Sequence, residues 1–167
     1  SVDEGYATER WLPVVGYEGV YEVSDFGRVR SLPRMIPTKW ETPRFHPGGI
    51  LKISVSSTTG YRRVTLVDAA RGAKRYASVH SLVLEAFVGP RPDGMECCHG
   101  DGDRGNPALW NLRWDTRSEN ANDAVRHGTN AHARRLTCQF GHPYTKVRHN
   151  NAKGWRRECR QCAADRR

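Results

Sequence analysis

The segment between Met95 and Gly128 constrains the fold more than any other part of the chain, because its pattern changes twice within a short distance. MECCH is β-prone and predicts a strand, GDGDRGN is rich in turn-forming residues, and NLRWDT predicts a second strand. TRSENANDAVRHG then predicts a helix, with Thr116 as N-cap, Glu119 three residues later and Gly128 as the stop signal. The expected unit is a two-stranded ribbon followed by a helix.

Three short β-prone runs precede this unit. They are LKISV, YRRVTLV and KRYASV, and turns at residues 57–60 and 68–72 separate them. The natural assembly of such runs is a small antiparallel sheet. HSLVLEAF then changes to a helical period, with Leu82 and Phe87 expected in the core, and VGPRPDG ends the helix.

The first organised segment, residues 9–34, consists of β-prone runs broken by glycines, which predicts small strands and tight turns. Arg28, Arg30 and Arg34 alternate with non-basic residues, so an extended backbone would project them from one face. That arrangement suits contacts with a phosphate backbone. Residues 35–49 are rich in Pro and Gly and show no sustained period, which predicts an irregular linker and a module boundary.

The positive charge is concentrated at the C-terminal end. The formal net charge is +9. There are 17 Lys and Arg against 16 Asp and Glu up to Thr129, but 10 against 2 from Asn130 onward. A basic segment attached to a nearly neutral body suggests a polyanionic partner, with a solvated, solubilising tail as the alternative. The expected DNA contacts in this segment are Arg156, Arg157 and Arg160.

Composition argues against a membrane protein. Hydrophobic residues make up 37% of the chain, and no apolar run approaches the roughly 20 residues that span a bilayer. SVDEGYATER has neither the basic start nor the apolar core of a secretory signal, so we expect a protein of the reducing cytoplasm. The five cysteines are then expected to be metal ligands or buried thiols rather than disulfides.

Four metal-ligating side chains lie in the basic tail. Their spacing is C-x3-H, sixteen residues, then C-x2-C, and the residues are Cys138, His142, Cys159 and Cys162. Two such knuckles fit one tetrahedral zinc, which would stabilise a segment with almost no apolar core. The variant with His149 in place of His142 and the reading as unrelated reduced thiols remain as alternatives.

The ribbon and helix carry side chains suited to phosphodiester chemistry. Hydrolysis needs a base that activates water, a metal ion that stabilises charge and a group that orients the base. His99 on the first strand would be the base, Asn111 at the start of the second strand would fix its ring, and Asn120 in the first turn of the helix would be a metal ligand.

These residues also carry a family resemblance. VHSLVLEAFVGPRPDGMECCHGDGDRGNPALWNLRWDTRSENANDAVRHGT resembles the HNH (ββα-metal) nuclease domain, in the branch found in phage homing endonucleases. WLPVVGYEGVYEVSDFGRVRSL resembles the NUMOD-type DNA-binding motif that commonly precedes this domain. The two segments stand in the order expected for those enzymes and cover nearly half of the chain.

The resemblance implies that His99 is the general base, Asn111 its orienting partner and Asn120 a ligand of one divalent ion, Mg²⁺ or Mn²⁺. The chain departs from the family pattern just before the base. There the family often has Asp or His as the second protein ligand, whereas this chain has Cys98. A thiolate prefers softer ions such as zinc, so either Cys98 is a weak or absent ligand, or Asp101 substitutes for it.

The sequence therefore predicts a small modular α+β protein with three parts. Residues 1–49 would be the DNA-binding motif and linker, and residues 50–130 would be the nuclease domain with its preceding small sheet. Residues 131–167 would be a basic tail stabilised by a bound zinc ion. The expected function is metal-dependent cleavage of double-stranded DNA in the cytoplasm of a phage-infected bacterium. One site cuts one strand, so a monomer would nick, and a dimer or sequential cuts would break both strands. The alternative is a non-catalytic, zinc-containing DNA-binding protein derived from such a nuclease.

Overall fold

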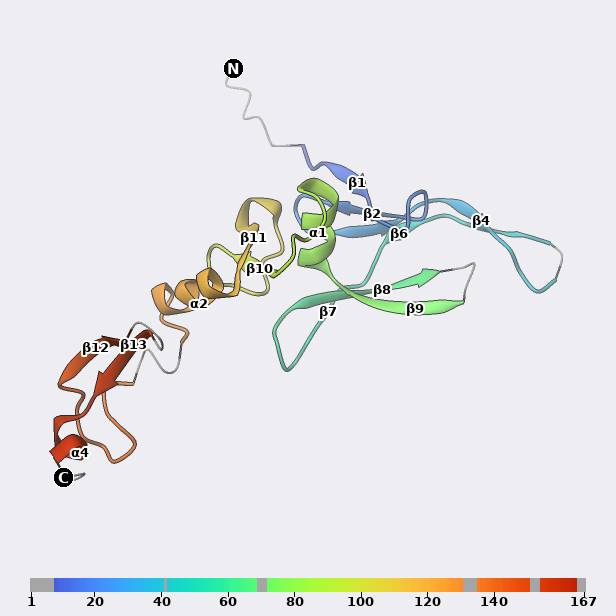
Figure 1. The fold of residues 1–167 in the computed structure, drawn as a ribbon. Helices are drawn as coiled ribbons and strands as arrows, with labels where there is room; N and C mark the ends of the chain where they lie inside the picture. Colours follow the sequence, from blue (N-terminus) through green and yellow to red (C-terminus); the bar gives the residue numbers. More distant parts are fainter. Residues whose placement is uncertain (1–7, 41, 69–71, 131–134, 151–153, 165–167) are drawn as a thin grey trace, which may run out of the picture. The chain divides into compact units, whose positions relative to one another are not determined.

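The computed structural model describes residues 8–40, 42–68, 72–130, 135–150 and 154–164 of the chain. The chain divides into two compact units, residues 1–123 and 124–167, and each is described here by itself. Short antiparallel strands and a few short helices make up the units, as the α+β prediction required (Figure 1). In the described part of the chain, no helix is long and apolar enough to cross a membrane.

The N-terminal strands form one antiparallel sheet in the order β1-β2-β3-β6. Its strands are β1 (Trp11–Pro13), β2 (Tyr21–Ser24), β3 (Val29–Ser31) and β6 (Gly49–Ile50). The turn between β2 and β3 needs glycine at position 27, where φ is +80° and a Cβ atom would collide with Pro107. This turn therefore packs directly against the loop that leads into the second strand of the ribbon.

Residues 35–49 are not the irregular linker that their Pro and Gly content predicted. β4 (Arg34–Ile36) and β5 (Arg44–His46) pair as an antiparallel hairpin, and β6 joins the first sheet beside β3. The prediction failed because the three prolines, Pro37, Pro43 and Pro47, lie just outside the paired residues, where a strand does not need their missing N–H groups.

The three strands expected between residues 51 and 78 are confirmed, although the first is shorter than expected. β7 (Ser54–Val55), β8 (Arg62–Asp68) and β9 (Ala73–Ser78) form an antiparallel sheet in that order. Alternation along β8 buries Val64 and Leu66. The chain then enters α1 (Val79–Phe87), whose Leu82 is buried as predicted, while Phe87 is only partly buried against the core.

One hydrophobic core joins the segments that were expected to be separate modules. The cluster contains side chains from the first sheet, from β8 and β9, from α1 and from the ribbon; they are Val14, Tyr21, Val23, Val29, Val64, Leu66, Ala77, Val79, Leu82, Val83, Leu84 and Leu112. Tyr21 also accepts a hydrogen bond at its hydroxyl from the Val67 backbone N–H at 3.1 Å. The expected boundary after residue 49 is therefore not a boundary between hydrophobic cores, because neither side has enough apolar residues to bury one alone.

The ribbon and its helix form as predicted. β10 (Met95–His99) pairs with β11 (Leu112–Thr116), the 3-10 turn η1 (Leu109–Asn111) precedes β11, and α2 (Arg117–Arg126) follows. The Thr116 hydroxyl accepts a hydrogen bond from the Glu119 N–H at 3.2 Å, which is the N-cap expected from sequence. After α2, Gly128 adopts φ +65° and closes the helix.

The second unit is a small hairpin between two turns that bear cysteines. β12 (Lys146–Asn150) pairs with β13 (Gly154–Glu158), and the short helix α4 (Arg160–Ala164) follows. Before the hairpin, an isolated bridge joins Thr137 to Pro143, and the Cys138 N–H donates to the His142 carbonyl at 2.8 Å. This unit places both halves of the Cys/His motif in described residues.

Candidate active site and metal centre

His99 ends β10 and is held in an aromatic cage. Its ring stacks on Tyr61 at a centroid distance of 5.7 Å and meets the edge of His80 at 5.3 Å. The side chain is only 7% exposed, and its Nε2 atom is buried without a hydrogen-bond partner among the described residues. Burial lowers the pKa of His99 below its usual value, although Asp101 opposes this shift. His99 is therefore a neutral imidazole at neutral pH, with a nitrogen available to accept a proton.

His80 is the second buried imidazole of this cage. Burial, reinforced by the nearby His99 and Arg63, lowers the pKa of His80 to about 4, so its ring stays neutral. The Tyr61 ring lies 4.7 Å from the His80 ring and contacts both histidines. The sequence assigned no role to Tyr61, because nothing in YRRVTLV indicates which distant residues its first side chain will meet.

Asn111 organises the loop that follows His99. Its Nδ2 donates to Asp101 Oδ1 at 2.9 Å and to the Asn106 carbonyl at 3.0 Å, and its Oδ1 accepts from the Asp101 N–H at 2.8 Å. Both ends of the amide are thus engaged by residues 101–106 rather than by the imidazole. The Gly100 N–H donates to the Asn111 carbonyl at 2.7 Å, which ties the loop to the start of β11. Direct orientation of the His99 ring by Asn111 stays a prediction.

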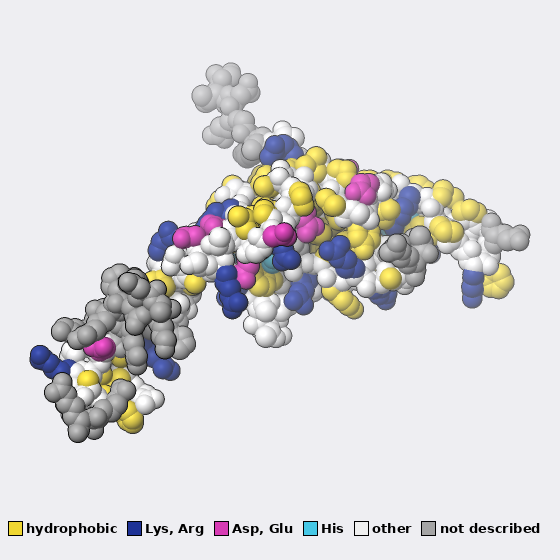
Figure 2. All heavy atoms as spheres, in the orientation of Figure 1, with side chains coloured by type: hydrophobic (Ala, Val, Ile, Leu, Met, Phe, Trp, Pro, Cys, Tyr) yellow, Lys and Arg dark blue, Asp and Glu magenta, His cyan; other side chains and the backbone are white. Residues whose placement is uncertain are grey.

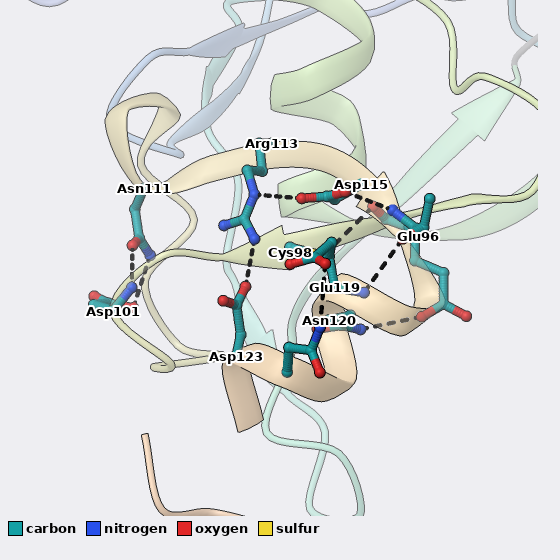
Figure 3. A network of polar contacts seen from close by, with 11 residues as sticks. Glu96, Cys98, Asp101, Asn111, Arg113, Asp115, Glu119, Asn120 and Asp123 are labelled. Atoms are coloured by element: carbon teal, nitrogen blue, oxygen red, sulfur yellow. Dashed lines mark hydrogen bonds and ion pairs between the residues drawn. The ribbon is translucent and has the colours of Figure 1, made fainter. Parts of the chain in front are cut away.

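Asn120 faces the ribbon from α2 and contacts a residue that the sequence analysis missed. Its Nδ2 donates to Glu96 Oε2 at 3.1 Å, as Figure 3 shows. Glu96 and Cys98 are two positions apart in β10, so alternation puts both on the same side of the strand. That spacing in MECCH was the available signal for Glu96.

The side chains around Cys98 form a charged network. Arg113, the register partner of Cys98, donates to Asp115 at 2.8 Å and to Asp123 on α2 (Figure 3). Cys98 itself is fully buried, and burial raises the pKa of its thiol, so the sulfur stays protonated at neutral pH. Asp123 lies three residues after Asn120, on the same face of α2, and Arg113 partly neutralises its carboxylate.

These donors fit a hard divalent ion only in part. Carboxylate and amide oxygens, which Glu96, Asp123 and Asn120 provide, are ligands that Mg²⁺ and Mn²⁺ prefer. A buried, protonated thiol is a poor ligand for such ions, so the Cys98 position contributes little to a site of this kind. Asp101, the other candidate, is committed to hydrogen bonds with Asn106 and Asn111.

The tail brings its four predicted ligands together. One ligand atom from each of Cys138, His142, Cys159 and Cys162 lies within 4.8 Å of the others. The Cys162 sulfur is 3.7 Å from that of Cys138 and 3.4 Å from His142 Nδ1. Two cysteine-bearing turns thus converge on one point, which is the arrangement of a closed four-ligand metal site. This group could hold a metal ion.

The arginines of the first sheet are stacked and paired. Arg28 and Arg30 lie over the Trp11 ring at 5.6 and 4.2 Å, and they form ion pairs with Glu9 and Glu22. They share one surface as predicted, with part of their charge neutralised. Arg34 stands apart, over the Tyr21 ring at 5.6 Å. In the tail, Arg160 is exposed, whereas the side chains of Arg156 and Arg157 lie outside the described residues.

The segments that build this site match two known families. Residues 9–67 match the NUMOD4 motif, and residues 77–122 match the HNH endonuclease family. The ribbon, His99 and the first part of α2 fall in the second match, and the stacked arginines fall in the first. One chain thus carries a match to the NUMOD4 motif followed by a match to the HNH endonuclease family.

A particular relative supports this assignment. DNA endonuclease I-HmuI of Bacillus phage SP01 is 30% identical over 119 residues, which make up 71% of this chain. The match spans 59% of that relative's length. A solved structure of the same relative, described as showing DNA binding and cleavage by the HNH homing endonuclease I-HmuI, aligns with a TM-score of 0.57 and 25% identity. That alignment covers 94% of this chain and 82% of the solved chain.

Proposed function

We propose that the protein is a metal-dependent DNA endonuclease that uses His99 as its general base. The observation that carries the proposal is the state of His99 in the HNH segment: a neutral ring, fixed by two aromatic neighbours, with a buried Nε2 that has no protein partner among the described residues. A buried acceptor without a partner costs free energy, so its retention at this position favours a catalytic role. Its task would be to accept a proton from the attacking water.

The neighbouring residues would prepare this step. Tyr61 and His80 would hold the His99 ring in one orientation. Because the pKa of His80 is lowered, its ring stays uncharged and does not disfavour protonation of His99. Asn111 keeps Asp101 and its loop beside the ring. Asn120 with Glu96 would hold one divalent ion, Mg²⁺ or Mn²⁺, with Asp123 close by. When bound, such an ion supplies charge stabilisation at the leaving 3′ oxygen.

DNA binding would use three surfaces. The Arg28 and Arg30 surface on Trp11 belongs to the segment that matches NUMOD4. The open face of the β8–β9 pair carries a second set of suitable side chains, Arg63, Lys74 and Tyr76, which alternation places together. The basic tail, including Arg156, Arg157 and Arg160, would add affinity through phosphate contacts. Residues 1–49 and 131–167 would thus grip the duplex while residues 50–130 cut it.

In the tail we assign the four-ligand cluster to a structural zinc ion. Three sulfurs and one imidazole are the ligand set of closed structural zinc sites, and no fifth protein ligand is needed. The likeness to a bacteriophage enzyme supports the cytoplasm of a phage-infected bacterium as the proposed site of action. A single chain carries one nuclease site, so a monomer would nick duplex DNA.

A second candidate is a DNA-binding protein that has lost catalysis. The fully buried, protonated Cys98 at the family's second ligand position favours it, because that position then holds no hard ligand. The two candidates agree on DNA binding and differ only on cutting.

Incubation of supercoiled plasmid with Mg²⁺, Mn²⁺, Zn²⁺ or chelator separates them. We expect nicked circles with Mg²⁺ or Mn²⁺ and none with chelator. His99→Ala should abolish nicking and leave DNA affinity nearly unchanged, whereas His127→Ala, at an exposed position just after α2, should cut normally. Normal cutting by His99→Ala would remove His99 from the mechanism. Binding without cutting under every metal would establish the second candidate.

A further inference from the structure

The β4–β5 hairpin exposes an apolar face that the fold does not use. Met35 and Phe45 are cross-strand partners and project from the same side of the hairpin, where they are 58% and 60% exposed. Trp40, in the connecting turn, is 72% exposed. The opposite side of the hairpin is half-buried through Ile36 and His46. The bare side chains are therefore confined to one face and the tip.

Such a hairpin is poorly stabilised by itself. Two strands alone are marginal in water, and neighbouring exposed apolar side chains usually mark a site of interaction. In Figure 1 the hairpin runs out from the first sheet, away from α1, and Figure 2 shows hydrophobic side chains gathered on it with a Lys or Arg side chain at its far end. The face is thus presented to a partner.

The charges on the hairpin identify the class of partner. Lys39 and Arg44 are exposed, and Lys39 Nζ lies 5.1 Å from the Trp40 ring centroid. Arg34 is anchored at the base, where its guanidinium donates to the Leu32 carbonyl at 3.1 Å and lies over Tyr21. Residues 34–46 contain three basic residues against the single acidic Glu41, which gives the segment a formal charge of +2. Apolar side chains flanked by cations complement the stacked bases and flanking phosphates of a nucleic acid duplex.

We propose that this hairpin inserts into a groove of duplex DNA next to the cleavage site and partly unstacks a base step. Met35, Phe45 and Trp40 would contact the bases, while Lys39 and Arg44 would contact the phosphates on either side. A two-stranded ribbon is narrow enough to enter a groove, and apolar wedges are known to open base steps there. The inference rests on the proposed DNA endonuclease function and adds a second element that would bend the substrate.

The test uses the 167-residue chain and short duplexes from its binding site, located by footprinting, that carry 2-aminopurine at successive positions. His99→Ala protein, which should not cut, is used for binding. Binding of protein with the unaltered hairpin should raise 2-aminopurine fluorescence at one base step of the duplex, because unstacking a base relieves the quenching by its neighbours. The double variant Met35→Ser, Phe45→Ser and the single variant Trp40→Ala should lose that signal and bind about tenfold more weakly, with an unchanged salt slope.

Two further variants separate charge from apolar contact. Lys39→Ala and Arg44→Ala should each lower the slope of log affinity against log salt by about one. Val88→Ser is the matched control, because Val88 is 62% exposed and lies after α1, outside the hairpin. It should change neither quantity. Circular dichroism and thermal unfolding should be the same for all variants, since the altered side chains are exposed.

The outcomes keep the two proposals apart. Plasmid nicking and duplex binding by the hairpin variants at wild-type strength, or no fluorescence change at any step, would overturn the hairpin proposal and leave the nuclease intact. Loss of fluorescence and affinity in a protein that never cuts would sustain the hairpin and remove catalysis. If the double variant instead converts a dimer to a monomer by sedimentation without weakening DNA binding, the face is a contact between copies and our proposal is wrong.

Discussion

At the scale of single residues, the site depends on two imidazoles kept neutral by burial. His80 and His99 meet ring edge to ring face, and each loses solvent that would stabilise its charged form. A protonated His80 would place a cation against the proposed base and weaken its tendency to accept a proton. Protonation of these two histidines at low pH should therefore lower both the proposed catalytic activity and the stability of the fold.

Stability is expected to fall in acid because of His80. The unfolded chain has an ordinary histidine pKa near 6.5, whereas the folded pKa is about 4, so the unfolded state binds the proton more readily between these values. Stability is complete above the unfolded pKa and declines as the pH drops toward the folded one, by about 3 kcal/mol. Urea unfolding of His80→Gln should show a flatter pH dependence. An equally steep decline in that variant would assign the effect elsewhere.

Cys98 offers a second prediction at the residue scale. Because its thiol is buried and protonated, Cys98→Ser should leave Mg²⁺-supported cutting nearly unchanged. Cys98→Asp should raise the rate in Mg²⁺, since a carboxylate oxygen suits that ion better than sulfur. Asp101→Ala should be severe if that residue completes the site. Rates of plasmid nicking in Mg²⁺ and Mn²⁺ measure all three, and total loss of cutting in Cys98→Ser would show that the sulfur is a ligand.

At the scale of elements, local patterns predicted most of what the structure contains. The cap at Thr116, the Gly128 stop and the two-stranded ribbon all follow from local sequence patterns, so the sequence was sufficient for them. The β4–β5 hairpin was missed because its paired segments are only three residues long, too short for a periodic signal. Tyr61 was missed because its role depends on long-range packing.

The second unit is the element whose stability should depend most on metal. Among the residues of this unit whose side chains are described, Cys159 is the only buried hydrophobic one, so we expect the four converging ligands to order it. We expect one zinc per chain by elemental analysis. Chelation or Cys159→Ser should increase amide hydrogen exchange in residues 135–164 while the exchange of α1 stays slow. Cys97→Ser, at a half-buried cysteine outside the cluster, is the control and should retain zinc. Protein purified without chelator that contains no zinc would contradict this prediction.

At the scale of the whole molecule, the nuclease segment depends on the N-terminal sheet. Tyr21 and Val23 lie in the same core as Leu82. Away from the core, the Leu109 N–H donates to the Asp25 carbonyl at 2.8 Å, and Gly27 packs on Pro107. These contacts hold the loop that enters η1 and hence the position of Asn111. One continuous hydrophobic core thus contains residues from both the NUMOD4 match and the HNH match.

A fragment of residues 50–130 should consequently fail to fold, although it contains every proposed catalytic residue. Without the first sheet, the α1 residues Leu82 and Val83 lose the partners that bury them, and a chain this short cannot replace that apolar area. Residues 1–130 should unfold in one cooperative transition and nick plasmid, because the tail is a separate unit. Urea denaturation and plasmid nicking of both fragments provide the measurement. If residues 50–130 alone unfold cooperatively and nick as fast as residues 1–130, the first sheet is dispensable, and its packing on α1 is not what holds His99 in its cage.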